Sequence, residues 1–404
     1  MQSTAQAYLT PRERMFRALR GEKADVVPAA PAYLSLYLAD LERAGYIEQY
    51  RRRVQGSRRC PVDHREDTLF RAQALYQSYG IFQARPDWIE VHTGATRAWA
   101  ERTAIVLGDD GRLYYEDQAS GLRVAMDAVP LPRGDAILAP PNPSLSDLWD
   151  GSGELDGPAD VDRRLPIRSA SELLARGDFD LPRQVLADCG DRYFISTVLD
   201  TPFSDAYNLL GFQGLMVIQH DRPALLHHLL ARQLAQTQEV MAAWAAIGLH
   251  GVYVEEVFTG ADILSPASYD EYVLAYNRPY FRRMRALGLL PIYYLCGDVV
   301  PRLQRMCELD VAAVAVEESK KSFRIEIAKV VEAVGGRVAV FGNIDTVRFG
   351  LHGTVEEMAA EVRRQAAIGV RARGFVVSTG SPFPLGTSPR LIDALVATAH
   401  ALAA

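Results

Sequence analysis

The feature of this sequence that most constrains its fold is a regular alternation of strand and helix patterns in its second half. Short apolar runs rich in β-branched and aromatic residues occur at residues 193–199, 251–254, 291–295, 311–316, 337–341 and 375–378. Helical patterns lie between and after them, at residues 223–246, 268–287, 299–309, 325–334, 355–368 and 389–402. Because strand–helix–strand units favour parallel pairing under covering helices, the alternation predicts an α/β fold. A doubly wound sheet fits the same rhythm, but no G-x-G-x-x-G follows any run, so we favour a closed (β/α) barrel.

The first half of the chain is less regular. Residues 10–21 carry a threonine cap, a proline and a glutamate three residues on, which predicts an N-terminal helix. Residues 26–31 form an apolar run that predicts a first strand, and residues 40–75 are mostly helical in pattern. Alternating runs at residues 88–92, 104–107, 113–116 and 122–126, separated by turn signals, predict an antiparallel β meander. We expect one barrel domain over residues 1–404, with residues 85–165 as an insertion or elaborated edge.

Composition and charge exclude several function classes. The net charge is −6, and no run of lysine and arginine could follow a phosphate backbone, so nucleic acid is not an expected partner. No apolar stretch approaches the roughly 20 residues that a membrane span needs, and the first residues lack the order of a signal peptide. The 4 cysteines include no C-x-x-C pair and form no disulfide framework. These features predict a cytoplasmic protein with reduced cysteines.

Polar residues come directly after the predicted strands of the second half. They are Asp200 and Thr201, Glu255 and Glu256, Cys296 to Asp298, Glu317 and Glu318, Asn343 and Asp345, and Thr379 and Ser381. In a (β/α) barrel the carboxyl ends of all strands meet at one rim, which is where such enzymes place their active sites. Each residue taken alone could equally cap a helix or stabilise a turn. Together they predict a functional rim.

Adjacent carboxylates stand out on this rim. Because side chains alternate along a strand, only one of Glu255 and Glu256 can face the barrel interior, and the same holds for Glu317 and Glu318. Carboxylates crowded at one rim either bind a cation or raise one another's pKa enough to act as acid or base. Cys296 with carboxylates from Glu255, Glu256, Glu317 or Glu318 would form a zinc-binding set. The alternative for Cys296 is a buried apolar role.

Several short sequence motifs occur along the chain in an order that matches a known superfamily. They are residues 10–21 (TPRERMFRALRG), 25–28 (DVVP), 202–211 (PFSDAYNLLG), 265–269 (SPASY) with Tyr276 and Pro279, 296–298 (CGD), 341–345 (FGNID), 378–382 (STGSP) and 387–389 (TSP). In this order they resemble the uroporphyrinogen decarboxylase superfamily, which includes that decarboxylase and cobamide-dependent methyltransferases acting on coenzyme M or on methyl donors. The resemblance covers nearly the whole chain and implies a (β/α)8 TIM barrel.

The resemblance also sets expectations for the site. Thiol-activating methyltransferases of this superfamily hold zinc on a His-x-Cys-Gly strand end and on a cysteine in a late Gly-Cys turn. The matching positions here hold Tyr294, Cys296 and Ser381, so a zinc site would have to recruit other groups, for which Glu255 and Glu317 are the candidates. The decarboxylases hold a tetrapyrrole with an early arginine-rich loop and an aspartate. Residues 29–37 (AAPAYLSLY) contain neither, so porphyrinogen decarboxylation is not expected.

Three functions stay open. The first is a small-molecule methyltransferase that is metal-assisted and uses a cobamide carried by a corrinoid partner protein. Its expected catalytic residues are Tyr294 as proton donor with Glu255, Glu256, Asp298 and Asn343; its expected metal ligands are Cys296, Glu255 and Glu317; and its expected substrate-binding residues are Asp200, Glu318, Asp345, Thr379 and Ser381.

The second function is a metal-free decarboxylase or lyase with Glu255 or Glu256 and Asp298 as its acid and base. The third is a barrel without catalysis that binds a ligand or a corrinoid protein. Apolar helix faces at residues 225–230 and 240–246 are either core or the interface of a homo-oligomer.

Overall fold

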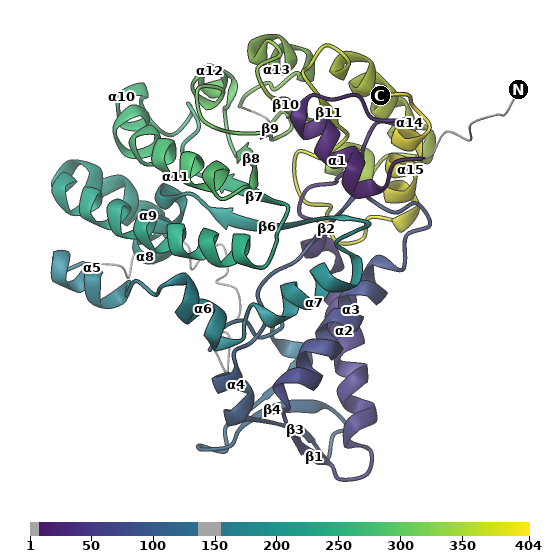
Figure 1. The fold of residues 1–404 in the computed structure, drawn as a ribbon, viewed down its shortest axis with the longest axis vertical. Helices are drawn as coiled ribbons and strands as arrows, with labels where there is room; N and C mark the ends of the chain where they lie inside the picture. The colour runs from purple at the N-terminus through teal and green to yellow at the C-terminus, as the bar shows by residue number, and fades with distance from the viewer. Residues whose placement is uncertain (1–7, 136–154, 321) are drawn as a thin grey trace, which may run out of the picture.

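The computed structural model describes residues 8–135, 155–320 and 322–404. A curved sheet of parallel strands forms its centre, in the order β11-β10-β9-β8-β7-β6-β2 (Figure 1). The strands are β2 (Trp88–Glu90), β6 (Phe194–Asp200), β7 (Gly251–Glu256), β8 (Leu290–Leu295), β9 (Ala313–Val316), β10 (Ala339–Phe341) and β11 (Phe375–Val376). All neighbouring pairs in this sheet are parallel, as the alternation of strands and helices predicts.

A short extended segment closes the sheet into a ring. On one side, the Val377 amide donates to the Pro28 carbonyl at 2.8 Å, and the Ala30 amide donates to the Val377 carbonyl at 2.9 Å. On the other side, the Asp87 amide donates to the Ala29 carbonyl at 2.8 Å, just before β2 begins. The apolar run expected near residues 26–31 therefore occupies the eighth strand position, and the (β/α)8 barrel is confirmed.

Helices surround the barrel and follow the predicted pattern closely. The outer layer holds α3 (His64–Tyr79), α7 (Asp180–Cys189), α8 (Pro202–Asp221), α9 (Pro223–Ala246), α11 (Ala275–Ala286), α12 (Leu303–Met306), α13 (Ile327–Val334), α14 (Val355–Gly369) and α15 (Pro389–His400). Shorter elements are α5 (Pro158–Arg164), α6 (Ala170–Arg176), α10 (Pro266–Ser268) and the π-helical turns Tyr269–Leu274 and Thr346–Leu351. Within the described ranges, none of the helices is both long and apolar enough to cross a membrane.

The N-terminal helix α1 (Pro11–Arg20) closes the amino-terminal end of the barrel. Its cap at Thr10 forms the predicted capping box with Glu13. Met15 and Leu19 belong to the same buried cluster as the barrel residues Phe194 and Trp88. The bottom of the barrel is therefore filled with apolar side chains, and any open site must lie at the opposite end.

Side-chain alternation divides each barrel strand between two clusters. Tyr253 and Tyr294 belong to the cluster inside the barrel, whereas Val254 and Tyr293 belong to the cluster between the sheet and the outer helices. The residues two positions after an inward side chain face inward again. This parity decides which rim residues face the barrel interior.

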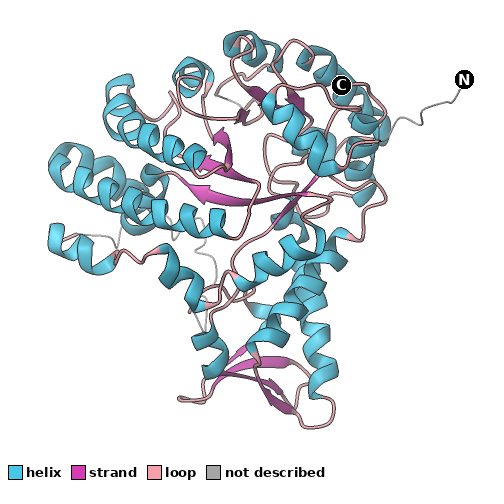
Figure 2. Ribbon diagram, in the orientation of Figure 1, coloured by secondary structure: helices cyan, strands magenta, loops and turns pink. Residues whose placement is uncertain are grey.

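A second, antiparallel sheet lies at the lower end of the molecule beside α2 (Leu34–Val54) and α4 (Arg97–Arg102) (Figure 2). Its order is β1-β3-β4-β5, with strands β1 (Arg59–Pro61), β3 (Thr103–Leu107), β4 (Leu113–Asp117) and β5 (Arg123–Ala125). The predicted meander is thus present, but assigning residues 88–92 to it was wrong. Trp88–Glu90 pairs in parallel with β6 in the barrel. The sequence could not show this, because a run of three buried residues has no periodicity that separates parallel from antiparallel pairing. The limits 85 and 165 of the insertion stay a prediction, and residues 136–154 lie outside the described part.

Candidate functional site

Two carboxyl groups meet at the carboxyl-terminal mouth of the barrel. Asp200 ends β6 and is the direct cross-strand partner of Glu255 on β7. Val198 and Tyr253, two positions earlier, pack in the barrel interior, so Asp200 and Glu255 also face inward. Glu90 on β2 follows inward-facing Trp88 by the same parity and is almost fully buried. The mouth therefore brings together acidic side chains from three strands.

The carboxyls of Glu255 and Asp200 hold protons more tightly than exposed ones. Burial raises the pKa of Glu255 to about 7, and the charges of Asp200 and Glu90 add to the effect. Burial also raises the pKa of Asp200 to about 6. Because the two groups repel each other when both are ionised, they titrate as a coupled pair. Near neutral pH the pair retains a proton and can act as an acid.

Aromatic rings form the floor beneath these carboxyls. The ring centroids of Tyr33 lie 5.3 Å from Tyr253 and 5.7 Å from Tyr294, and the rings of Tyr253 and Tyr294 stack at 5.5 Å. Tyr33 has φ 53°, a left-handed conformation that is rare for a tyrosine and that is found preferentially at functional sites. The strained residue precedes α2 and projects its ring into the mouth.

Two hydroxyls of this aromatic floor are buried and unsatisfied. Neither the Tyr33 hydroxyl nor the Tyr253 hydroxyl has a hydrogen-bond partner of ordinary geometry within the described part of the chain. The Tyr33 hydroxyl nevertheless lies near enough to the Glu255 carboxyl to lower its pKa, opposing the effect of burial. Buried hydroxyls without a partner are uncommon and mark places where a ligand or water supplies the missing bond.

A second polar group gathers where β8 and β9 end. The Gly297 amide donates to the Glu317 carboxylate at 3.0 Å, in a turn where Gly297 has φ 111°. The Lys320 ammonium lies 3.0 Å from the other oxygen of Glu317 and also binds the Glu318 carboxylate. The Ser381 hydroxyl donates to Glu318 at 2.7 Å. Lys320 thus pairs with both carboxylates predicted at this rim.

The residues expected to bind zinc do not fit a zinc ion. Burial raises the pKa of the Cys296 thiol, and the neighbouring Glu317 carboxylate raises it further. The Lys320 ammonium already occupies the face of Glu317 that a cation would take. Across residues 8–135, 155–320 and 322–404, no three His, Cys, Asp or Glu side chains are arranged to hold a metal ion. No step through zinc follows from this geometry.

Glu256 and Tyr294, both expected to be catalytic, are hydrogen-bonded to other groups of the protein. Glu256 points out of the barrel, is fully buried, and accepts hydrogen bonds from Thr201 at 2.8 Å, Ser204 at 3.2 Å, Asn277 at 2.8 Å and Tyr293 at 3.0 Å. It therefore ties β7 to α8, β8 and α11. The Tyr294 hydroxyl, expected to donate a proton, donates to the Gly380 carbonyl at 2.9 Å. The sequence could show that only one of Glu255 and Glu256 faces inward, and the structure identifies it as Glu255.

The remaining predicted residues lie around the mouth and hold loops. The Asn343 amide donates to the carbonyls of Glu317 at 3.1 Å and Ile325 at 3.0 Å. The Thr379 hydroxyl accepts the Ala32 amide at 3.1 Å and so fixes the approach to Tyr33. Asp345 caps the helical turn that follows it by accepting the amides of Val347 and Arg348. Asp298 is half-buried after β8, where its backbone amide donates to Asp262 at 2.9 Å.

Sequence reasoning missed four residues of this region. Tyr33 and Lys320 lie in loops with no recognisable motif, and Glu90 and His92 fall in the run assigned to the meander. The Ser35 hydroxyl donates to Glu90 at 2.5 Å and lies 3.3 Å from the His92 imidazole. Assigning Trp88–Glu90 to the barrel would have placed a histidine at a strand end. The only sequence signal for that assignment was the apolar character of the run.

Comparison with known proteins places the chain in a family. The sequence model of the family described as Uroporphyrinogen decarboxylase (URO-D) matches residues 180–402. Two curated relatives are each 27% identical to this chain. They are the uroporphyrinogen decarboxylases of Xanthomonas axonopodis pv. citri, matched over 229 residues, and of Xanthomonas euvesicatoria pv. vesicatoria, matched over 269 residues. These matches cover 49% and 59% of this chain, but 59% and 72% of the two relatives, so this chain spans less than two thirds of the first.

A solved structure shares the fold over nearly the full length. The structure of a methyltransferase from Methanosarcina mazei has a TM-score of 0.61 and 17% sequence identity, and the match covers 96% of this chain and 98% of that one. At this identity the likeness concerns the fold alone. Since the family match spans more than half of the chain and the barrel agrees with it, the chain belongs to the uroporphyrinogen decarboxylase (URO-D) family.

Proposed function

We propose that this chain is a methyltransferase that acts on a small molecule at the barrel mouth, with Glu255 as its general acid. The observation that carries the proposal is a carboxyl with a pKa of about 7 beside two buried hydroxyls for which the described residues provide no partner. A proton donor whose pKa lies near the working pH is the most effective kind. Tyr33 and Tyr253 would supply the missing hydrogen bonds to the substrate.

In the proposed reaction, Glu255 donates one proton to the leaving group. Methyl transfer breaks the bond between the methyl carbon and a heteroatom of the donor, and the methyl carbon bonds to the nucleophile of the acceptor. The bonding electron pair stays on the heteroatom, which then takes the proton from Glu255. Asp200, the cross-strand partner, keeps that proton available near neutral pH by raising the pKa of Glu255. A cobamide on a corrinoid partner protein is the acceptor that the family resemblance suggests, and it stays a prediction.

The charge of the mouth favours methyl transfer over decarboxylation. A carboxylate placed for loss of carbon dioxide would face Asp200, Glu255 and Glu90, and like charges at this distance repel. A methyl group presented to these carboxyls on a neutral heteroatom meets no such penalty. The Methanosarcina mazei structure with the same fold is named a methyltransferase, which agrees with this choice.

A metal-free decarboxylase or lyase is the second candidate. The curated relatives are named uroporphyrinogen decarboxylases, and the same Asp200 and Glu255 pair could protonate the carbon that carbon dioxide leaves. Both candidates use the same acid. They differ in the products, which makes them separable by experiment.

The test is a pair of assays on purified protein with a panel of O-, N- and S-methyl compounds and small carboxylic acids. One follows the absorbance of cob(I)alamin as it is methylated, and the other follows release of carbon dioxide. We expect methylation by the wild type and a loss of about 100-fold or more in Glu255→Gln. Glu48→Gln, on the exposed face of α2, is the matched control and should leave turnover unchanged. Carbon dioxide release without methylation would overturn methyl transfer, and full activity of Glu255→Gln would overturn both candidates.

A further inference from the structure

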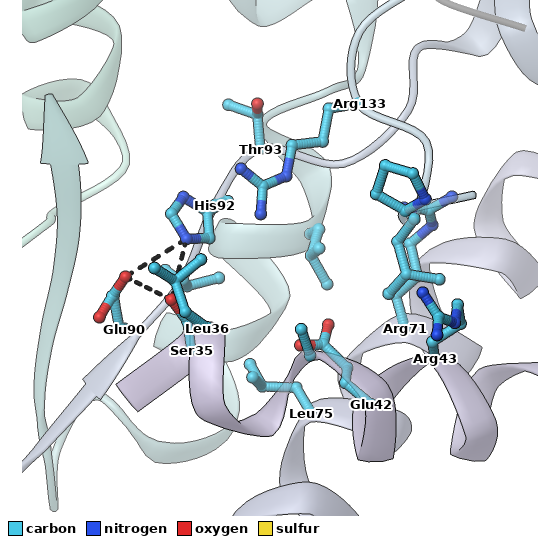
Figure 3. Close-up of a pocket in the computed structure, with 15 residues that line it drawn as sticks. Ser35, Leu36, Glu42, Arg43, Arg71, Leu75, Glu90, His92, Thr93 and Arg133 are labelled. Atoms are coloured by element: carbon cyan, nitrogen blue, oxygen red, sulfur yellow. Dashed lines mark hydrogen bonds and ion pairs between the residues drawn. The ribbon is translucent and has the colours of Figure 1, made fainter. Parts of the chain in front are cut away.

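A cavity of about 120 Å³ lies beside the barrel mouth, between α2, the end of β2 and the loop at residues 130–133 (Figure 3). Ser35, Glu42, Arg71, Glu90, His92 and Arg133 are among the residues that line it. Glu90 belongs to the mouth as well, because its charge also raises the pKa of Glu255. The cavity is therefore next to the proposed reacting groups and lies outside the barrel.

The cavity contains one arginine, Arg133, that has no hydrogen-bond or ion-pair partner among residues 8–135, 155–320 and 322–404. Arg43 is bonded to Asp40 at 2.7 Å, and Arg71 is bonded to Asp67 at 2.6 Å and to the Pro132 carbonyl at 2.7 Å. Arg133 forms no hydrogen bond or ion pair with any residue that the structure describes. Figure 3 shows its side chain extending over the cavity on the side of His92 and Thr93. A guanidinium held over a concave site without a counterion is suited to a planar anion.

An acid without a hydrogen-bond partner faces the same cavity. Glu42 forms no hydrogen bond with the described residues, and Figure 3 shows it rising from α2 toward the space below Arg133. Burial raises its pKa to about 7, with Glu90 adding to the effect and the cations of Arg133 and Arg71 opposing it. The charged and titratable groups around it are Arg43 on its own helix, Arg71 and Tyr79 on α3, Glu90 and His92 at the end of β2, and Arg133 on the loop.

We propose that this cavity binds the carboxylate of a small carboxylic acid through Arg133, and that this acid is the substrate or its leaving portion. That the bound acid is the substrate rests on the proposed function, whereas the binding of a carboxylate in the cavity does not. A carboxylate carries one charge and meets a single free guanidinium. A doubly charged phosphate would be repelled more strongly by the neighbouring Glu42 and Glu90. Leu36, Leu75 and Leu181 supply apolar walls for the remainder of such a molecule.

Glu42 makes this binding depend on pH. When Glu42 is protonated, Arg133 is free for the ligand, and when Glu42 is ionised it repels the ligand carboxylate and competes for the same cation. A bound anion in turn favours the protonated form of Glu42. Affinity is therefore expected to fall as pH rises through about 7.

Benzoate is the probe, with benzamide as its uncharged match, and isothermal titration calorimetry measures both from pH 6 to pH 8. We expect benzoate to bind more tightly than benzamide by about 10-fold or more, and Arg133→Gln to weaken benzoate by a similar factor. Arg43→Gln is the matched control, because Arg43 already has a partner, and should change affinity less than about 2-fold. Glu42→Gln should bind benzoate and lose the fall in affinity across pH 7.

Equal binding of benzoate and benzamide, no binding of either, or unchanged benzoate affinity in Arg133→Gln would overturn the proposal. Tighter binding of inorganic phosphate than of benzoate would overturn the choice of carboxylate. The same titration on Glu255→Gln separates this inference from the proposed reaction. If Glu255→Gln still binds benzoate and keeps full turnover, the proposed role of Glu255 is wrong and the proposed carboxylate site in the cavity is retained.

Discussion

Asp200 and Glu255 lie directly opposite each other on the parallel strands β6 and β7, and both side chains turn into the barrel. In this register Asp200 is the charged neighbour that raises the pKa of Glu255 most, after burial itself. The pKa of Glu255 is raised to about 7 and that of Asp200 to about 6. The proton that Glu255 can hold near neutral pH is the basis of the proposed chemistry.

Replacing Asp200 by asparagine should move the pH dependence of turnover. The charge of Asp200 raises the pKa of Glu255, so removing it lowers that pKa. Activity that needs protonated Glu255 falls as pH rises through about 7, and in Asp200→Asn this fall should occur at lower pH. A pH profile of kcat checks the shift. An alkaline limb that stays in place in Asp200→Asn would show that the two groups are not coupled.

Tyr294→Phe should have a small effect on catalysis. The Tyr294 hydroxyl is already bonded to the Gly380 carbonyl, so its loss removes a structural hydrogen bond worth about 1 kcal/mol of unfolding free energy. We expect kcat to stay within about 5-fold of the wild type, measured in the methylation assay. A loss of about 100-fold with an unchanged melting temperature would instead make Tyr294 the proton donor.

Glu256→Ala should reduce stability. The substitution removes the acceptor for Thr201, Ser204, Asn277 and Tyr293, whose polar groups would then be buried without partners. The expected cost is about 1–3 kcal/mol of unfolding free energy in a urea titration. Glu256→Gln, which keeps the size and one acceptor oxygen, should cost less. Equal stability of Glu256→Ala and wild type would mean that this network does not hold β7 to its helices.

Cys296→Ala should leave the metal content unchanged. No three His, Cys, Asp or Glu side chains among the described residues are arranged to hold a metal ion, and the Lys320 ammonium already pairs with Glu317. We expect elemental analysis to find zinc far below one equivalent in both the wild type and Cys296→Ala. Stoichiometric zinc in the wild type that disappears in Cys296→Ala would restore the metal-assisted mechanism.

The barrel and the polar residues at its rim could be predicted from the sequence because both follow from local patterns. Repeated apolar runs with intervening helices specify parallel strands, and a polar residue after each run then lies on one rim. Asp200, Glu255, Cys296 and Glu317 were found in this way. The bounds 223–246 predicted for α9 coincide with those of the helix, which begins at a proline.

The parts that could not be predicted depend on contacts between distant segments. Trp88–Glu90 is too short to reveal its partner, so Glu90 and His92 were placed in the wrong sheet. Tyr33 enters the mouth through a left-handed backbone conformation that no sequence signal announces. The choice between Glu255 and Glu256 needs the position of Tyr253 inside the barrel, which alternation alone does not fix.

The most direct test of the central claim is an NMR titration of the Glu255 carboxyl, with ¹³C-labelled glutamate in the wild type and in Glu255→Gln to assign the signal. We expect a carboxyl with a pKa of about 7 that is missing from Glu255→Gln and shifts downward in Asp200→Asn. A Glu255 carboxyl that titrates near 4.5, the ordinary value for glutamate, would contradict its role as an acid at neutral pH.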